Sequence, residues 1–147
     1  MNTPFRGDYE HTLDAKNRLT VPSRFRSILG GNDIVLARGI EACVTAWRPE
    51  EFDSWTRRMI EALGGLTPKA RDFRRMVSAS AFETELDSAG RVMIPTKLIE
   101  YAGIDREVSV VGEFENFEVW DRSAWQTWDD AKKGEIRDIV DTIGSDG

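Results

Sequence analysis

Short segments of alternating apolar and polar residues at the start of the chain predict β-strands. The segments YEHTLD (9–14) and RLTVP (18–22) have this pattern, and AKN (15–17) joins them. The segments DIVLARG (33–39) and ACVTAWR (42–48) are rich in aliphatic and β-branched residues and predict two more strands. The first half of the chain is therefore expected to contribute four short strands.

Apolar residues at helical spacing predict two helices in the same half. The segment SRFRSILGG (23–31) can begin with Ser23 as its N-cap and end at Gly30 in the left-handed conformation. The segment PEEFDSWTRRMIEAL (49–63) has Pro49 in its first turn, which suits a helix start. The apolar stripe of this second helix consists of Phe52, Trp55, Met59 and Leu63.

The second half of the chain repeats the first. A shift of 73 residues aligns the two halves without a gap and gives nine identities over 43 positions. The match is densest between LDAKNRLTVP (13–22) and LDSAGRVMIP (86–95), and Trp47 falls on Trp120. Each half is therefore one unit with the order β-β-α-β-β-α, which indicates an α+β fold rather than a parallel, doubly wound sheet.

Neither repeat is large enough to bury a core of its own. Two repeats can complete one core, so we expect intertwined hairpins in a single domain with pseudo-two-fold symmetry. The expected boundaries are residues 8–51 for repeat 1 and residues 81–124 for repeat 2. A helical linker of residues 52–80 and a helical tail of residues 125–147 are expected to pack on the same compact domain.

Composition argues against several classes of protein. Of the 147 residues, 40% are hydrophobic, and there is one cysteine, Cys43, and one histidine, His11. Such a sequence predicts no internal disulfide framework and no metal site. No apolar run approaches the length of about 18 residues that a membrane helix needs, and the start lacks an apolar signal segment. We expect a soluble cytoplasmic protein without a membrane partner. No nucleophile or phosphate-binding motif is present, so we expect no enzyme, cofactor or small-molecule substrate.

Charge is distributed unevenly along the chain. The net charge is −6, yet residues 1–31 carry +2 and residues 56–76 carry +4, whereas residues 106–147 carry −6. Attraction to phosphate depends on the face that is presented rather than on the total, so an acidic chain can still bind nucleic acid. The acidic tail from Asp129 to Asp146 is then expected to lie away from the nucleic-acid-binding face.

The repeated Asp-x-x-x-Arg turn is the main candidate for a functional site. Its aspartate can accept backbone N–H groups of the turn, and its fourth residue can take the left-handed conformation. Its arginine either pairs with the aspartate as a structural clamp or reaches a partner. The residues concerned are Asp14, Asn17 and Arg18 in the first turn and Asp87, Gly90 and Arg91 in the second.

The chain resembles the MraZ family over roughly residues 4 to 130. The resemblance lies in the opening FRGDYEHTLDAKNRLTVPSRFR (5–26) and in two Leu-Asp-x-x-x-Arg-x-x-aliphatic-Pro turns, each followed by a matched tryptophan. It implies a double swapped-hairpin (AbrB-like) barrel of two tandem SpoVT-AbrB repeats, and ring-like homo-oligomers. It also implies a transcriptional repressor in the cytoplasm and nucleoid. That repressor would bind double-stranded DNA at direct repeats upstream of its own operon for cell division and cell-wall synthesis.

The resemblance carries DNA contact over to particular residues. Arg18 and Arg91 match the family's DNA-facing arginines, and Lys16 matches its first-turn lysine. The second turn has Ala89 at the corresponding position, so the first turn is expected to hold DNA better. Asn17 stands where the family usually has glycine, and asparagine tolerates the same backbone geometry. An arginine fork can bind a phosphate or a guanine edge with two hydrogen bonds.

Other basic and aromatic residues have two interpretations each. Arg6, Arg24 and Arg26 flank the first hairpin in sequence and either are ordinary surface charge or contact the DNA backbone; Lys97 is a weaker candidate of the same kind. A basic helical segment either is solvated or contacts another subunit; it contains Lys69, Arg71, Arg74 and Arg75. The five tryptophans are expected in the core or in an interface.

Two rival functions stay open from the sequence. A protein-interaction module of the same swapped-hairpin fold, similar to antitoxin-like relatives, would use its hairpins on another protein. An enzyme has no support beyond the number of acidic residues. A steep salt dependence of DNA binding separates a DNA-binding regulator from the interaction module.

Overall fold

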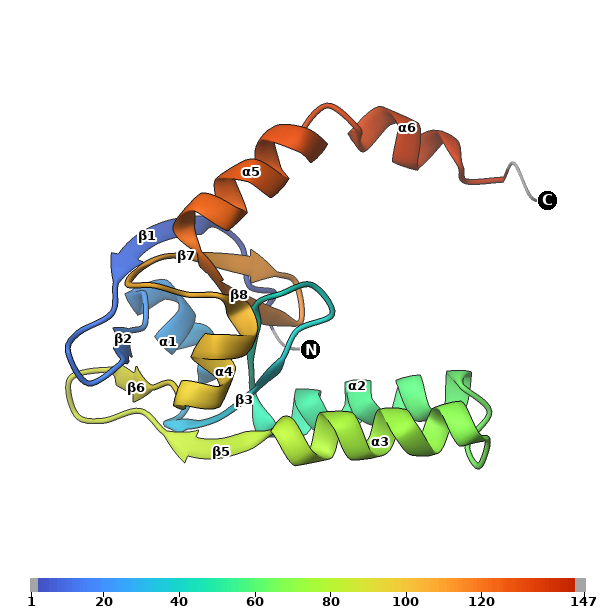
Figure 1. Cartoon of the computed structure of the whole chain (residues 1–147), viewed down its shortest axis with the longest axis horizontal. Helices are drawn as coiled ribbons and strands as arrows, with labels where there is room; N and C mark the ends of the chain where they lie inside the picture. Colours follow the sequence, from blue (N-terminus) through green and yellow to red (C-terminus); the bar gives the residue numbers. More distant parts are fainter. Residues whose placement is uncertain (1–2, 145–147) are drawn as a thin grey trace.

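The computed structural model describes residues 3–144 of the chain (Figure 1). Residues 145–147 of the expected tail, among them Asp146, lie outside the described residues. Within the described range, no helix combines the length and the apolar character that crossing a membrane requires.

Each repeat forms the elements that its hydrophobic pattern predicts. Repeat 1 consists of β1 (Asp8–Thr12), β2 (Arg18–Thr20), α1 (Ser23–Leu29), β3 (Asp33–Arg38), β4 (Val44–Trp47) and α2 (Pro49–Ala62). Repeat 2 consists of β5 (Phe82–Glu85), β6 (Arg91–Met93), α4 (Thr96–Ala102), β7 (Glu107–Glu113), β8 (Asn116–Asp121) and α5 (Arg122–Lys132). Helix α3 (Pro68–Ser80) joins the repeats, and α6 (Ile136–Asp141) follows α5.

The strands of the two repeats are exchanged. A six-stranded sheet has the order β1-β7-β8-β4-β3-β5, and a second, two-stranded sheet pairs β2 with β6. At one edge β1 of repeat 1 pairs with β7 of repeat 2, and at the other edge β5 of repeat 2 pairs with β3 of repeat 1. This antiparallel, intertwined arrangement confirms the expected α+β swapped-hairpin fold with pseudo-two-fold symmetry.

The first two strands of each repeat do not pair with each other. The turn between β1 and β2 is present, but it joins strands of different sheets, and the same holds for β5 and β6. Strand β2 pairs with β6 across the repeats instead, with Leu19 opposite Val92. The ribbon at this end of the molecule thus takes one strand from each repeat.

Aromatic residues from both repeats meet in a single core. The ring of Phe25 lies 5.4 Å from that of Phe5 and 5.1 Å from that of Phe117, measured between centroids. Buried Arg48 donates from Nη1 to the carbonyl oxygen of Ile28 at 2.8 Å, and its guanidinium carbon lies 5.2 Å from the Phe5 centroid. Because Phe117 comes from repeat 2 and the other residues come from repeat 1, neither repeat can keep this core without the other.

The ends of the short helices follow from local sequence, with one correction. Gly30 and Gly103 end α1 and α4 in the left-handed conformation, with φ of 72° and 62°. The expected capping of α1 by Ser23 is wrong, because Ser23 is already the first helical residue. Pro22 precedes the helix, and its carbonyl oxygen accepts the Arg26 N–H at 3.0 Å.

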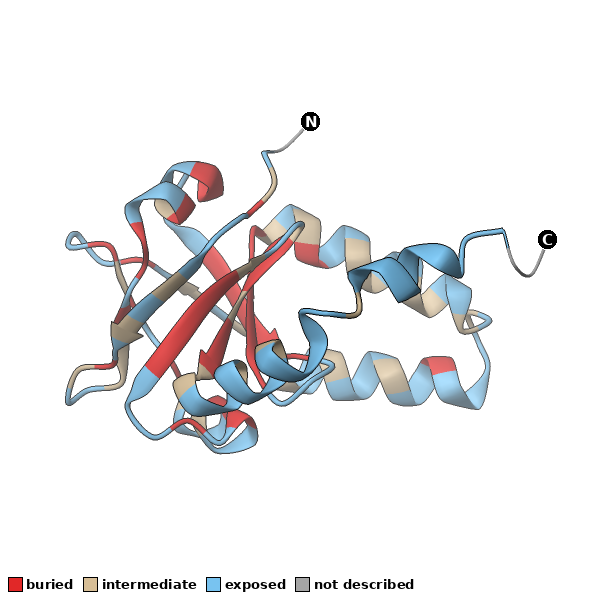
Figure 2. Cartoon of the chain, turned by 90° about the horizontal axis from the view of Figure 1, so that it is seen from above, coloured by how far each residue is buried: buried red, intermediate tan, exposed pale blue. Residues whose placement is uncertain are grey.

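The two ends of the molecule have different characters (Figure 1). The α2–α3 hairpin and the α5–α6 tail extend from one end, and the turns that precede β2 and β6 lie at the opposite end. Buried residues gather in the sheet, whereas α5 and α6 contain none (Figure 2). The two turns are therefore free of the helical extensions, which leaves them open to a partner.

Candidate nucleic-acid interface

The β2–β6 ribbon has one buried and one open face. Leu19 and Val92 are opposite each other, and each is only 1% exposed. Side chains alternate along a strand, so the residues on either side of this pair share the other face. That outer face consists of Arg18 opposite Met93 and Thr20 opposite Arg91. The two arginines therefore lie diagonally across the open face of the ribbon.

The first turn is held by the carboxylate of Asp14. Its Oδ1 accepts the backbone N–H groups of Lys16 and Arg18, both at 2.9 Å, and its Oδ2 accepts the Arg18 Nε–H at 2.7 Å. Asn17 has a φ of 58°, the left-handed conformation that asparagine tolerates better than most residues. One side chain thus fixes both the backbone of the turn and the direction of Arg18.

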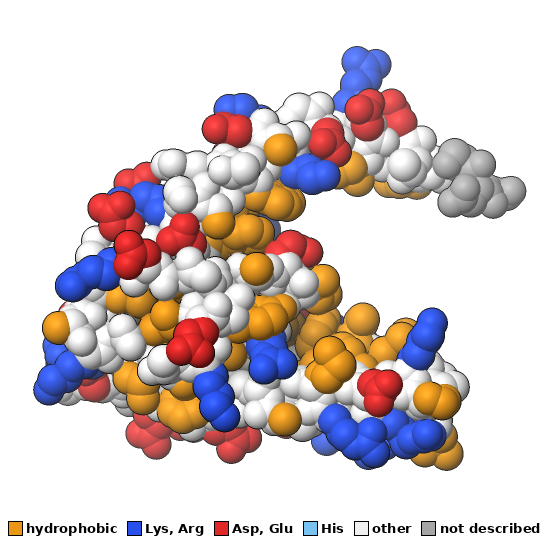
Figure 3. Space-filling model, viewed as in Figure 1, with side chains coloured by type: hydrophobic (Ala, Val, Ile, Leu, Met, Phe, Trp, Pro, Cys, Tyr) orange, Lys and Arg blue, Asp and Glu red, His pale blue; other side chains and the backbone are white. Residues whose placement is uncertain are grey.

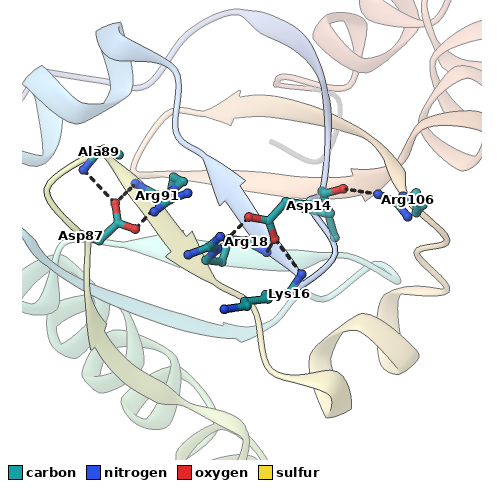
Figure 4. A network of polar contacts seen from close by, with 8 residues as sticks. Asp14, Lys16, Arg18, Asp87, Ala89, Arg91 and Arg106 are labelled. Carbon is teal, nitrogen blue, oxygen red and sulfur yellow. Dashed lines mark hydrogen bonds and ion pairs between the residues drawn. The ribbon is translucent and has the colours of Figure 1, made fainter.

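The second turn has the same geometry (Figure 4). Oδ1 of Asp87 accepts the backbone N–H groups of Ala89 and Arg91, and Oδ2 accepts the Arg91 Nε–H, all at 2.9 Å. Gly90 supplies the positive φ, at 75°. The two repeats therefore build the same aspartate-held turn at both ends of the ribbon.

The hydrogen bonds in the turns stabilise the charged form of both aspartates. The bond from the Arg18 backbone N–H is the main cause that lowers the pKa of Asp14 to about 2, with further contributions from the Arg18 side chain and the Lys16 N–H. Bonds from Arg91 and Ala89 likewise lower the pKa of Asp87. Both carboxylates are therefore ionised at neutral pH and hold their arginines by charge as well as by hydrogen bonding.

The aspartates occupy only one nitrogen of each arginine. Within the described residues, the Nη atoms of Arg18 and Arg91 have no hydrogen-bond partner, since both ion pairs run through Nε. The side chains of Arg18 and Arg91 are 30% and 35% exposed. An arginine oriented in this way keeps two N–H-bearing nitrogens for an external acceptor and loses little side-chain freedom on binding.

Two other candidates from the sequence lie near the turns. Lys16 is exposed in the first turn, and its side chain extends alongside that of Arg18 (Figure 4). Arg24 is exposed on α1, which begins beside the second turn because the Val21 N–H donates to the Gly90 carbonyl oxygen at 3.0 Å. In the chain Arg24 follows the first turn, so the strand exchange carries it from one turn to the other.

Arg6 lies apart from this group. It precedes β1, and its neighbour Phe5 pairs with Phe114 between β7 and β8, at the end of β1 that is opposite to the first turn. Arg6 flanks the first hairpin in sequence, but β1 separates it from the first turn in space, and its contact with DNA stays a prediction.

Two further basic residues lie at the turns: Arg106, which the sequence interpretation missed, and Arg26, which it placed beside the first hairpin and not at the second turn. Nη2 of Arg106 donates to the Leu13 carbonyl oxygen at 3.4 Å (Figure 4). The backbone carbonyl oxygen of Arg106 accepts the Leu13 N–H at 2.9 Å. Arg26 lies against Gly90, where an added Cβ would collide with the guanidinium. Each arginine belongs to the repeat opposite to the turn that it contacts. Only the combination of the repeat with the strand exchange could have revealed them.

A hollow lies at the end of the molecule away from the turns. Figure 3 shows apolar side chains gathered between the α2–α3 hairpin and the α5–α6 tail, where a cavity of about 480 Å³ is found. The rings of Trp125 lie 5.4 Å from Trp120 and 5.3 Å from Trp128 along its wall, and Trp128 is 39% exposed. This surface combines tryptophans with several glutamates and differs in this from the basic ribbon.

Comparison with known proteins gives a consistent result. A family model described as "MraZ protein, putative antitoxin-like" matches residues 5–76 and 77–138, one copy for each repeat. A relative named Transcriptional regulator MraZ, from Acetivibrio thermocellus, is 37% identical over 124 residues, which cover 84% of this chain and 85% of the relative. A relative of the same name from Lactiplantibacillus plantarum is 35% identical over 139 residues, covering 95% and 97%.

The matches agree with the geometry on each point that they share. The two copies of the family model correspond to the two exchanged units, and together they include both aspartate-held turns. The relatives align over nearly the whole chain, so the helical extensions are included as well. On these grounds, the chain belongs to the MraZ family.

Proposed function

We propose that the protein is a sequence-specific DNA-binding transcriptional repressor. Its sites would be direct repeats upstream of the cell-division and cell-wall operon that encodes it, and it would act in the cytoplasm and nucleoid. The relatives' name, transcriptional regulator, supports the general role. One structural observation carries the proposal. The open face of the β2–β6 ribbon presents Arg18 and Arg91, each with free Nη atoms and each oriented by an aspartate.

A two-stranded ribbon has the right shape for this task. The major groove of B-form DNA admits a β-ribbon, and arginine is the side chain that most often reads guanine there, through O6 and N7. Arg18 and Arg91 would read base edges, while Lys16 and Arg24 beside the turns would hold phosphates. The DNA-contacting unit would then be the pair of repeats, residues 8–51 and 81–124, without the helical extensions.

The acidic character of the chain does not oppose this function. The net charge is −6, but the acidic residues of α5 and α6 extend from the end of the molecule opposite to the turns (Figure 1). Over a distance greater than about 8–10 Å, salt largely screens repulsion between those residues and DNA at the ribbon. The local charge of the ribbon then determines whether DNA is attracted to it.

We propose that the hollow is where copies of the chain meet. In repeat 1, α3 covers the aromatic cluster beside β4, and Phe73 of α3 lies 5.8 Å from Trp55. The equivalent cluster of repeat 2, around Trp120 and Trp128, has no such cover among the described residues. Helix α6 presents Ile136 and Ile139, which are 69% and 62% exposed. The α6 helix of a second copy would supply the missing cover.

The tail and helix α3 carry opposite charges. The α5–α6 tail carries acidic residues beside its apolar ones; they are Asp129, Asp130, Glu135, Asp138 and Asp141. Helix α3 carries the basic residues Lys69, Arg71, Arg74 and Arg75, which lie outside the lining of the hollow. A tail that packs in the hollow of the next copy makes a head-to-tail contact, and such contacts form a ring when the rotation between neighbouring copies closes. A ring would present several ribbons to direct repeats, and linkage of this kind raises avidity by about 10²–10⁴-fold.

DNA binding is tested by footprinting the protein on DNA upstream of its own gene at two salt concentrations. We expect protected direct repeats, binding that weakens steeply with salt, and loss of protection for Arg18→Ala. Arg57→Ala is the matched control, because it removes the same charge from an exposed position of α2, far from the turns. Unchanged protection by Arg18→Ala, with normal folding, would contradict the proposal.

Assembly is tested by analytical ultracentrifugation of Ile139→Glu beside the control Thr127→Glu, which adds the same charge on a different face of the tail. We expect Ile139→Glu to dissociate the oligomer and to bind DNA more weakly, and Thr127→Glu to keep both properties. Full assembly of Ile139→Glu would rule out this interface.

The second candidate is a protein-interaction module, which the family description "putative antitoxin-like" favours. In that case the ribbon would bind another protein chain. Its binding to upstream DNA would be weak and would not discriminate the native repeats from scrambled DNA, so a scrambled probe in the footprint distinguishes the two functions.

A further inference from the structure

Helix α1 of repeat 1 reaches the turn of repeat 2. The Arg26 side chain lies across Gly90, so a Cβ built on that glycine would stand 2.7 Å from Cδ and 2.9 Å from Cζ of Arg26. Real side chains do not tolerate such approaches, and the space is available only because residue 90 is glycine. The second turn therefore has a guanidinium from the other repeat resting on its outer surface.

Arg26 has no acidic partner among the described residues. No ion pair or hydrogen bond of its side chain is found there, in contrast to Arg18 and Arg91, whose Nε atoms are held by aspartates. Its side chain is half-buried, which restricts its position without neutralising its charge. A positioned but unpaired guanidinium is suited to binding an anion from outside the molecule.

Comparison of the two turns shows what Arg26 replaces. The first turn carries Lys16, and the repeat places Ala89 at the matching position of the second turn. The same alignment of the repeats places Ile99 of α4 at the position of Arg26. Ile99 is apolar, partly buried and packed against the core. Each turn thus has a basic residue close to its ribbon arginine, besides Arg106 at the first turn and Arg24 near the second. In the first it comes from the turn itself, and in the second it comes from the adjacent helix.

We propose that Arg26 is a DNA-phosphate contact of the second turn, forming with Arg91 a composite basic pair that stands in for the absent lysine. This inference rests on the proposed DNA-binding function and goes beyond it in one respect. The second turn is then as competent to hold DNA as the first, although its own sequence lacks a lysine. The strand exchange makes this possible, because it brings α1 of repeat 1 beside the turn of repeat 2.

The test uses Arg26→Gln, Ala89→Lys and the double variant, with operator DNA titrated at several salt concentrations. Each phosphate contact contributes about 0.9 to the slope of log K against log salt. We expect Arg26→Gln to reduce the slope by about that amount for each subunit on the DNA. Adding Ala89→Lys should restore it, because the new lysine lies in the turn where Lys16 lies in the first. Arg57→Gln, which loses the same charge at an exposed position of α2, should keep the wild-type slope.

The outcomes separate this inference from the proposed function. A wild-type slope for Arg26→Gln, with binding lost in Arg91→Ala, overturns the role of Arg26 and leaves DNA binding intact. Unchanged binding in both Arg18→Ala and Arg91→Ala overturns the proposed function itself. Thermal melting of each variant reports on folding. If Arg26→Gln also has a lower melting temperature, the double variant decides. A restored salt slope at the lowered melting temperature supports the inference, and a salt slope that is not restored overturns it.

Discussion

At the scale of single residues, the two turns depend on one carboxylate each. Asp14 accepts two backbone N–H groups and the Arg18 Nε–H, and Asp87 repeats the arrangement with its own arginine. One oxygen of each carboxylate closes the turn and the other orients the arginine, so structural and binding roles belong to one group. The two interpretations that the sequence left open for the Asp-x-x-x-Arg turn are therefore compatible with each other.

The lowered pKa of Asp14 predicts a pH dependence of stability. Its pKa is about 2 in the folded protein and about 3.9 in an unfolded chain. The contribution of the turn is therefore complete above about pH 4 and is lost as the pH falls through about 2. Melting temperatures measured from pH 6 to pH 2 should show wild type above Asp14→Asn at pH 6 and converging with it in acid. A constant difference across that range would contradict this mechanism.

The positive φ of both turns gives a matched pair of substitutions. Asn17→Ala and Gly90→Ala each place alanine in the left-handed conformation, at a cost of about 1–2 kcal/mol. Only the new Cβ at residue 90 also displaces Arg26. Urea unfolding should show comparable losses of stability, whereas operator titration should show weaker binding for Gly90→Ala alone. Equal DNA binding by the two variants would count against the placement of Arg26.

At the scale of elements, the two faces of the β2–β6 ribbon have different roles: one packs on the core and the other is available to bind DNA. Its inner face, formed by Leu19 and Val92, belongs to the core, and its outer face carries the arginines. The strands are three residues each, so the ribbon has little hydrogen bonding of its own and depends on what lies beneath it. Its rigidity, and with it the orientation of the arginines, is a property of the core.

Leu19→Ala should therefore destabilise the protein by about 2–4 kcal/mol through the cavity that it leaves. Met93→Ala, on the outer face of the same ribbon and 45% exposed, should change stability by less than about 0.5 kcal/mol. Urea-induced unfolding of the two variants measures both values. Similar losses for the two substitutions would show that the ribbon is not two-faced in solution.

At the scale of the whole molecule, exchange makes the repeats interdependent. Strand β1 of repeat 1 pairs with β7 of repeat 2, and β3 of repeat 1 pairs with β5 of repeat 2. Each half alone would therefore lack strand partners. The central phenylalanines also come from both halves. A protein built in this way folds as one unit although its sequence reads as two.

Residues 1–80, expressed alone, should therefore be unfolded or should associate with a second copy that supplies the missing strands. Circular dichroism and sedimentation of this fragment, beside the full chain, measure the outcome. A folded, monomeric fragment would contradict the interdependence of the repeats. Mixing it with residues 81–147 should restore the ordered sheet, because the two pieces together contain every strand.

What the sequence by itself determined is local. The order of elements, the glycines that end α1 and α4, and the repeat of 73 residues follow from periodicity, backbone freedom and residue identity, which act over a few positions. The capping role expected of Ser23 was wrong, because proline already occupies the position before the helix and its fixed backbone starts the helix one residue earlier.

Only the tertiary structure decided which residues share a surface. The pairing of β2 with β6, the transfer of Arg24 and Arg26 to the second turn, the arrival of Arg106 at the first and the separation of Arg6 from both all depend on strand exchange. Exchange is favoured by burial of apolar surface between segments far apart in the chain, and such burial leaves no trace in the spacing of neighbouring residues. The basic face of the ribbon therefore takes its residues from both repeats, although the sequence of each turn lies within one repeat.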